Sequence, residues 1–81
     1  MTEQQYQKKL INEFESNGWF VLKLIKTNKN GIPDLLCLKD GHKPTFIEVK
    51  AKNGKVSKLQ EYRINELKRF GFEAFVSKSE K

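Results

Sequence analysis

The chain has 81 residues, a formal net charge of +6 and a sequence pI near 9.6. This length predicts one domain over residues 1–81 with a modest core, and the positive charge favours an anionic partner such as nucleic acid. One cysteine and one histidine exclude a Cys/His zinc site and an internal disulfide, and they argue against Ser-His-Asp catalysis. No apolar run is long enough to span a membrane and no signal peptide is apparent, so we expect a soluble intracellular protein.

The first predicted element is a helix over residues 2–17. Thr2 is a good N-cap, and Gln5 completes a capping box three residues later. An apolar stripe at helical spacing follows, made of Tyr6, Leu10, Ile11 and Phe14. Asn17-Gly18 ends the helix. A strand is expected over residues 19–26, with alternate side chains on opposite faces, and then a polar loop.

The rest of the chain predicts two strands, a helix and a last strand. In order they are a strand over residues 33–39, a strand over 45–51, a helix over 57–70 and a strand over 72–77. Asp40-Gly41 is a strong hairpin signal between the first two, and Ser57 is a good N-cap for the helix. The resulting order, α-β-β-β-α-β, predicts an α/β fold in which helices pack on a sheet.

Three charged residues interrupt these apolar strands. Asp34 begins one strand, whereas Glu48 and Lys50 lie two apart in the next and therefore point to the same face. Charges on an apolar strand are costly unless they are paired or used. Two carboxylates converging with an ammonium group suit a hard divalent cation and an activated water. The alternative is a buried ion-pair cluster without chemistry.

Three short sequence motifs that contain or follow these residues resemble those of a known protein family. They are Gly-Ile-Pro-Asp at 31–34, Ile-Glu-Val-Lys at 47–50 and Ser-Lys-Leu-Gln at 57–60. In this order and spacing they resemble the VRR-NUC branch of the PD-(D/E)xK nuclease superfamily, including its small stand-alone, phage-type members. The resemblance covers about residues 2–76. It implies a restriction-endonuclease-like core with a mixed sheet flanked by helices, and a cytoplasmic location in a bacterium or a phage-infected host cell.

The resemblance also implies the roles of the site residues. Asp34, Glu48 and the backbone carbonyl of Val49 would bind Mg²⁺ or Mn²⁺. Lys50 would help to deprotonate the attacking water or stabilise charge at the phosphate.

Glu3 is the candidate for a further carboxylate from the first helix. It falls near the meridian of the apolar stripe, and related nucleases have a first-helix glutamate that reaches toward the metal. Its alternative role is to complement the helix dipole. Glu13, at the edge of the stripe, and Glu15, which points away from it, are rivals for the same role.

Gln60 has two possible roles as well. It lies on the inward face of the second helix, and the family has a glutamine near the active site at this position. Alternatively, it is the capping-box partner of Ser57. We expect that one side chain cannot readily do both. His42, in the hairpin turn, is expected to be a solvated turn residue.

Together these features predict a metal-dependent endonuclease that hydrolyses DNA, with structure-specific cutting of branched DNA such as four-way junctions and a homodimeric assembly. The alternative is a catalytically silent nucleic-acid-binding subunit on the same scaffold; a third possibility is one part of a larger restriction or repair assembly. Backbone phosphates are expected to be bound by lysines that flank the carboxylates in sequence: Lys26, Lys29, Lys52, Lys55 and Lys58.

Overall fold

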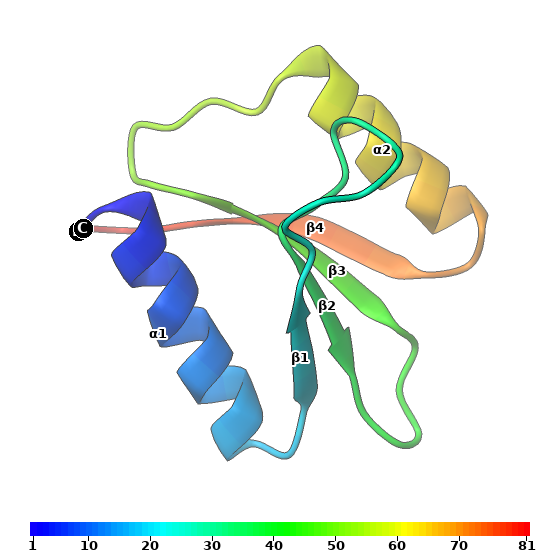
Figure 1. Cartoon of the computed structure of the whole chain (residues 1–81), viewed down its shortest axis with the longest axis horizontal. Helices are drawn as coiled ribbons and strands as arrows, with labels where there is room; N and C mark the ends of the chain where they lie inside the picture. Colours follow the sequence, from blue (N-terminus) through cyan, green and yellow to red (C-terminus); the bar gives the residue numbers. More distant parts are fainter.

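The computed structural model describes residues 1–81 and has the expected order of elements (Figure 1). They are α1 (Glu3–Ser16), β1 (Phe20–Lys23), β2 (Leu35–Leu38), β3 (Thr45–Lys50), α2 (Lys58–Arg69) and β4 (Glu73–Lys78). The predicted α-β-β-β-α-β order is therefore confirmed. No helix is long and apolar enough to cross a membrane.

Both helices begin with the predicted caps. The Thr2 hydroxyl accepts the Gln5 N–H, and the Gln5 side chain accepts the Thr2 N–H in return. Ser57 and Gln60 form the same reciprocal pair at the start of α2. Such boxes satisfy backbone donors that have no partner inside the helix, and they fix where each helix starts.

The sheet is mixed, with the strand order β1-β2-β3-β4. Strands β1, β2 and β3 pair antiparallel, whereas β3 and β4 run parallel and are joined by α2. In the register of β2 and β3, Leu35 lies opposite Ile47. Continuing this register by one residue brings Asp34 opposite Glu48, as the sequence predicted.

The first strand is shorter than expected. It was predicted over residues 19–26 but pairs with β2 only over Phe20–Lys23. One further backbone bond, from Leu24 N–H to the Asp34 carbonyl at 2.8 Å, extends the pairing. Pro33 has no N–H to continue the ladder, so the chain leaves the sheet there and residues 25–32 form a loop.

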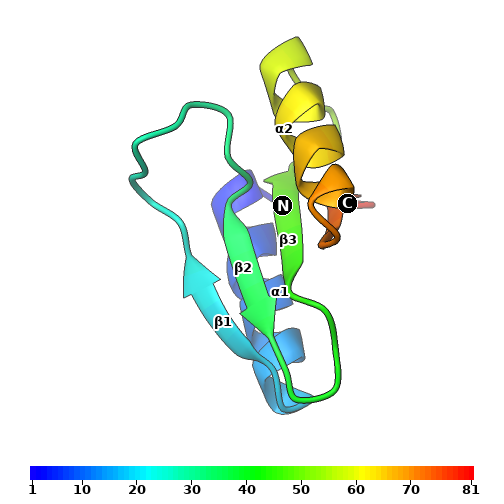
Figure 2. The same cartoon turned by 90° about the vertical axis from the view of Figure 1, so that its right-hand side faces the viewer.

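The two helices cover opposite faces of the sheet. On one face, α1 packs against a core of buried side chains, namely Leu10, Leu35, Cys37, Ile47 and Val49. On the other face, Ile64 and Leu67 of α2 pack against Ala74 and Phe46. Figure 2 shows α1 behind β2 and β3, and α2 beside the loop between β1 and β2. Because strand side chains alternate, Glu48 and Lys50 share the α2 face with Phe46.

Part of the α2 face is uncovered. Trp19 and Val21 pack on the core beneath α1, whereas Phe20 and Leu22 are 62% and 39% exposed. The helix α2 contacts mainly β4, and β1 has its main helix contact with α1, on the other face. The core is small as well, with 12 of 81 residues buried.

Candidate active site

Asp34 is fixed to the neighbouring strand by its side chain. It lies directly before β2, and its Oδ2 accepts the backbone N–H of Val49 at 2.8 Å. The other oxygen, Oδ1, has no hydrogen bond to the protein. The carboxylate is therefore held across the end of the sheet and keeps one oxygen available to a ligand.

Glu48 is the most deeply buried charged residue of the site, with 3% of its surface exposed. Its Oε2 accepts a hydrogen bond from Gln60 Nε2 at 2.9 Å and lies 3.3 Å from Lys50 Nζ. Its Oε1 has no protein partner. Since no fully buried side-chain oxygen in the chain lacks a partner, Oε1 reaches the surface of the site.

The electrostatics of the site are strained at Glu48. Burial, followed by the nearby negative charge of Asp34, raises the pKa of Glu48 from 4.5 to about 7. The ammonium of Lys50 opposes this shift but does not cancel it. A divalent cation beside the two carboxylates would favour their ionised forms, so this local charge imbalance matches the chemistry of a cation site.

Gln60 has both of the roles that the sequence left as alternatives: it caps α2 and it contacts the site. Its Oε1 accepts the Ser57 N–H at 2.9 Å, while its Nε2 donates to Glu48. The expectation that one side chain cannot do both was wrong, because the two ends of the amide have opposite hydrogen-bonding character. The N-cap of α2 is thereby linked directly to the buried carboxylate.

Glu3 lies in the first turn of α1 and is exposed. It makes no ion pair, but its negative charge contributes to the raised pKa of Glu48, as the weakest of the causes. Among its rivals, Glu13 pairs with Lys9 at 4.0 Å and Glu15 is exposed. Neither affects Glu48. Of the three acids of α1 considered for the site, Glu3 is thus the one whose charge acts on Glu48. Its catalytic role stays a prediction.

The residues present fit a divalent cation with few protein ligands. Nowhere in the chain do three Asp, Glu, His or Cys side chains form a metal cluster. The free oxygens of Asp34 and Glu48 are two oxygen donors. The carbonyl of Lys50 accepts from Ser79 on the β4 side, so the carbonyl of Val49, one residue earlier, points to the β2 side, beyond the end of β2. Magnesium commonly binds to such a small set and keeps several waters.

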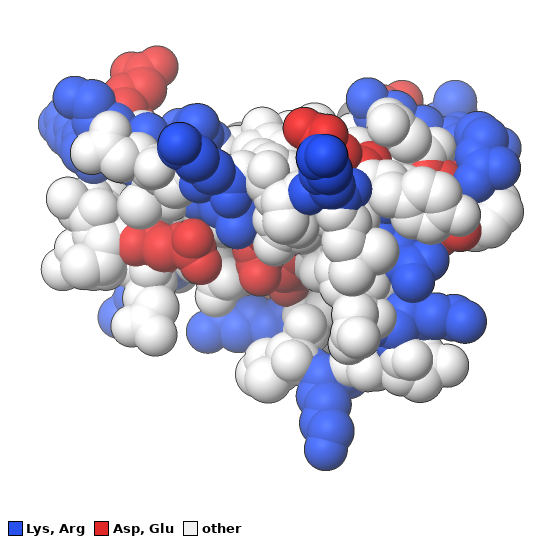
Figure 3. Space-filling view, turned by 90° about the horizontal axis from the view of Figure 1, so that it is seen from above, with Lys and Arg blue, Asp and Glu red and all other residues white.

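The predicted phosphate-binding lysines lie in two segments next to the site residues in sequence, two in the loop before Asp34 and three between Lys50 and Gln60. Figure 3 shows acidic side chains near the middle of this view, with Lys and Arg side chains around them. All five lysines are exposed and none pairs with an acid: Lys26, Lys29, Lys52, Lys55 and Lys58. They are free to contact a polyanion.

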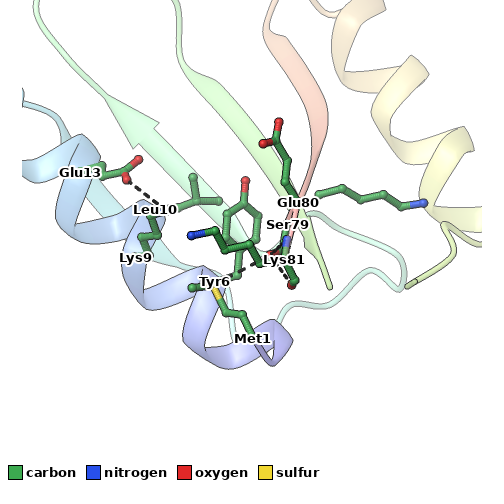
Figure 4. A pocket seen from close by; sticks show the side chains of 9 residues that line it. Met1, Tyr6, Lys9, Leu10, Glu13, Ser79, Glu80 and Lys81 are labelled. Carbon is green, nitrogen blue, oxygen red and sulfur yellow. Dashed lines mark hydrogen bonds and ion pairs between the residues drawn. The ribbon is translucent and has the colours of Figure 1, made fainter. Parts of the chain in front are cut away.

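Other features lie apart from the site. His42 is exposed and packs against Trp19, with ring centroids 5.0 Å apart, in the turn at the opposite end of β2. A cavity of about 190 Å³ lies between α1 and the end of the chain, where Tyr6, Leu10 and Ser79 line it (Figure 4). The site residues Asp34, Glu48, Lys50 and Gln60 do not line that cavity.

Sequence reasoning missed one contact that shapes the site. Arg63 Nε of α2 donates to the Asn30 carbonyl at 2.9 Å and anchors the loop that precedes Asp34. The partners are 33 residues apart, and no local pattern connects them. The only indication in the sequence is that Arg63 lies next to the buried face of α2, which Ile64 and Leu67 form.

The mixed sheet, the flanking helices and the paired carboxylates beside a lysine define a nuclease-type domain. The family model of the VRR-NUC domain matches residues 1–81, and the chain belongs to the VRR-NUC family. A solved structure described as a VRR_NUC domain is similar, with a TM-score of 0.82 and 30% sequence identity; the match covers 98% of this chain and 87% of that one. No curated protein matches the chain.

Proposed function

We propose that this protein is a metal-dependent endonuclease that hydrolyses phosphodiester bonds in DNA. The observation that carries the proposal is the buried Glu48, which faces Asp34 and is held by Gln60 and Lys50. A purely structural role would leave a strained carboxylate with one free oxygen beside a second carboxylate. Perturbed carboxylates at an open surface are typical of catalytic sites.

Asp34, Glu48 and the Val49 carbonyl would hold Mg²⁺ or Mn²⁺. When bound, the ion would supply charge stabilisation at the phosphoryl group and would lower the pKa of a nearby water. The hydrogen bond from Val49 N–H fixes Asp34, and the amide of Gln60 fixes Glu48. Both ligands are therefore oriented before any ion arrives, which limits the reorganisation that binding requires.

Lys50 is the residue placed to act on the phosphate or on the attacking water. Its side chain is 14% exposed, so the ammonium is partly shielded from solvent but still reaches the surface. A fixed positive charge in a partly dry site stabilises the developing negative charge of the transition state more than a solvated one does. Glu3 would approach from α1 and complete the acidic side of the site.

Branched DNA, such as a four-way junction, is the substrate class that we propose. The exposed lysines supply sequence-independent contacts to backbone phosphates. Both helices pack an apolar face on the sheet, and the chain adds no further helix to this core that could serve as a dedicated recognition helix. The shape of the DNA is then a better source of selectivity than its base sequence.

We also propose that two copies of the chain associate. The core is small, and large apolar side chains such as Phe20, Phe72 and Phe75 are 36–62% exposed. A two-fold dimer would carry two symmetric sites and suits paired cuts on two strands. Light scattering should report about twice the 9.5 kDa chain mass, and a monomer at tens of micromolar would contradict this assembly.

One experiment tests the function as a whole. Duplex, flap, splayed and four-way DNA are incubated with the protein in Mg²⁺, Mn²⁺ or EDTA, and the products are resolved on denaturing gels. We expect cleavage of branched DNA with either metal and none with EDTA. Binding of the same DNA without cleavage under any condition would instead identify a catalytically silent binding subunit, for which the lysines alone are sufficient.

A further inference from the structure

A second feature of the site is an open cavity formed by the loop that precedes Asp34. Residues from Leu24 to Asp34 line it, and its volume is about 430 Å³. Ligand sites in proteins commonly have volumes of about 300 to 1,000 Å³. Because Asp34 belongs to the lining, anything bound there would lie against the proposed catalytic centre.

The walls of this cavity are held in place. The Leu24 N–H bonds to the Asp34 carbonyl at 2.8 Å and closes the base of the loop. The Asn30 carbonyl accepts from Arg63 of α2, which anchors the far side. Gly31 has a φ of +79° and lies so close to Leu59 that an added Cβ would come within 2.7 Å of its Cγ. The cavity is therefore preformed rather than an incidental gap in a loose loop.

The lining combines two chemistries. Leu24, Ile25 and Ile32 are apolar, and Ile25 is 87% exposed, the highest value among the large exposed hydrophobic residues. Lys26 and Lys29 stand beside them without acidic partners. An apolar wall next to two cations fits a molecule with a flat apolar face and an attached phosphate.

We propose that this cavity binds one unpaired nucleotide of the DNA, adjacent to the phosphate that is cut. The base would lie against Leu24, Ile25 and Ile32, while Lys26 and Lys29 would bind its phosphates. Bases in a continuous duplex are stacked and cannot enter, whereas a bulge or branch point offers an unstacked base. Apolar contact reads no hydrogen-bonding edge, so the site would select DNA structure without selecting sequence.

This inference rests on the proposed nuclease function, and the test separates the two. The probes are three DNA molecules of one sequence: a plain duplex, a duplex with one bulged nucleotide, and the same bulge with the base removed. Affinities are measured in Ca²⁺ for the wild type, for Ile25→Ser and for Phe70→Ser. Phe70 is 64% exposed but lies at the far end of α2, so its variant controls for loss of an exposed apolar side chain.

We expect the wild type and Phe70→Ser to bind the intact bulge about tenfold more tightly than the abasic bulge, as burial of roughly 50 Å² of apolar surface predicts. In Ile25→Ser this ratio should fall to near one, while thermal melting stays unchanged because Ile25 is exposed. Equal affinity of the wild type for both bulges, or an unchanged ratio in Ile25→Ser, would overturn the nucleotide pocket even if the protein cleaves DNA. Failure to bind any of the three probes would overturn the pocket and the DNA-directed function together.

Discussion

The amide of Gln60 does two jobs, and substitutions at α2 can separate them. Gln60→Glu keeps an acceptor for the Ser57 N–H, so the capping box survives, but it replaces the donor to Glu48 with another acid. Loss of such a supporting contact typically lowers metal affinity or activity about 10- to 100-fold. We therefore expect a fall of that size in the nicking rate, with the helix content unchanged by circular dichroism.

Ser57→Ala is the matched control for this prediction. It removes the cap at the same helix end but leaves the Gln60 amide free to donate to Glu48. We expect it to lower stability by about 1 kcal/mol and to retain most of the activity. The reverse pattern, with an active Gln60→Glu and an inactive Ser57→Ala, would show that Gln60 matters only as a helix cap.

Glu48 makes a prediction about pH. Its pKa is about 7 in the folded protein and 4.5 in the unfolded chain, so between these values the folded state holds a proton that the unfolded chain has lost. Stability should therefore fall as the pH rises through this window, by on the order of 3 kcal/mol in total. Urea unfolding between pH 4 and pH 8 without divalent ions measures the effect, and Glu48→Gln should flatten it.

A divalent ion should reverse this loss. An ion that binds only the folded, ionised site adds stability by mass action, so Mg²⁺ or Mn²⁺ should stabilise the protein more at pH 8 than at pH 5. The same pH profile in the wild type and in Glu48→Gln would show that the pKa of Glu48 is not raised by its burial and by Asp34.

At the level of single residues, the sequence predicted the positions of the side chains that depend only on spacing along a strand or on a hairpin register. Strand alternation brought Glu48 and Lys50 to one face, and the hairpin register brought Asp34 opposite Glu48. The double role of Gln60 was not predictable, because it depends on how closely the start of α2 approaches β3. The bond from Arg63 to Asn30 depends in the same way on tertiary packing.

At the level of elements, caps and turns were predictable because their signals are local. The Thr2–Gln5 capping box formed as expected, and so did the Ser57–Gln60 box, which was one of the two roles left open for Gln60. Gly71, with a φ of +96°, ends α2 where the sequence predicted. The extent of β1 was not predictable, because it is set by its partner rather than by its own residues. Nor did its alternation indicate which face is buried, since both faces are apolar and only the position of α1 decides.

The loop before Asp34 is expected to tolerate substitution of its glycine less well than the hairpin turn after β2. Gly31 and Gly41 both have positive φ, at +79° and +77°, but only Gly31 is crowded, by Leu59 and Arg63. A residue with a Cβ in this conformation costs about 1 to 2 kcal/mol. We expect Gly41→Ala to lose about that much stability and to keep its activity.

Gly31→Ala should lose more, because Leu59 must also move, and it should impair both DNA binding and nicking by displacing the loop. Urea unfolding and nicking assays on the two variants provide the comparison. Equal losses of stability with equal activities would show that the packing of this loop on α2 has no functional consequence.

At the scale of the whole molecule, the positive charge predicts how DNA binding depends on salt concentration. The net charge is +6, and the five lysines that flank the carboxylates in sequence are exposed and pair with no acid. Each phosphate contact releases counterions, so the logarithm of the affinity for duplex DNA should fall with the logarithm of salt concentration by about 0.9 per contact. Replacing Lys52, Lys55 or Lys58 with glutamine should lower that slope by about one contact each.

Binding in Ca²⁺ at several salt concentrations measures this slope. Lys8, which is exposed on α1 and lies outside the predicted phosphate-binding set, provides the control. A slope that falls equally for Lys8→Gln and Lys55→Gln would indicate that the whole basic surface attracts DNA without a defined binding face.

The proposed function depends most on Asp34, Glu48 and Lys50 forming a metal-dependent nuclease site. Its most direct test is the cleavage of a labelled four-way junction by the wild type and by Asp34→Asn, each purified free of host nucleases and shown by circular dichroism to be folded. We expect cleavage by the wild type in Mg²⁺ or Mn²⁺, none in EDTA, and a loss of at least about 100-fold in Asp34→Asn, as removal of a group that acts in the transition state implies. Equal cleavage by the two proteins would contradict it.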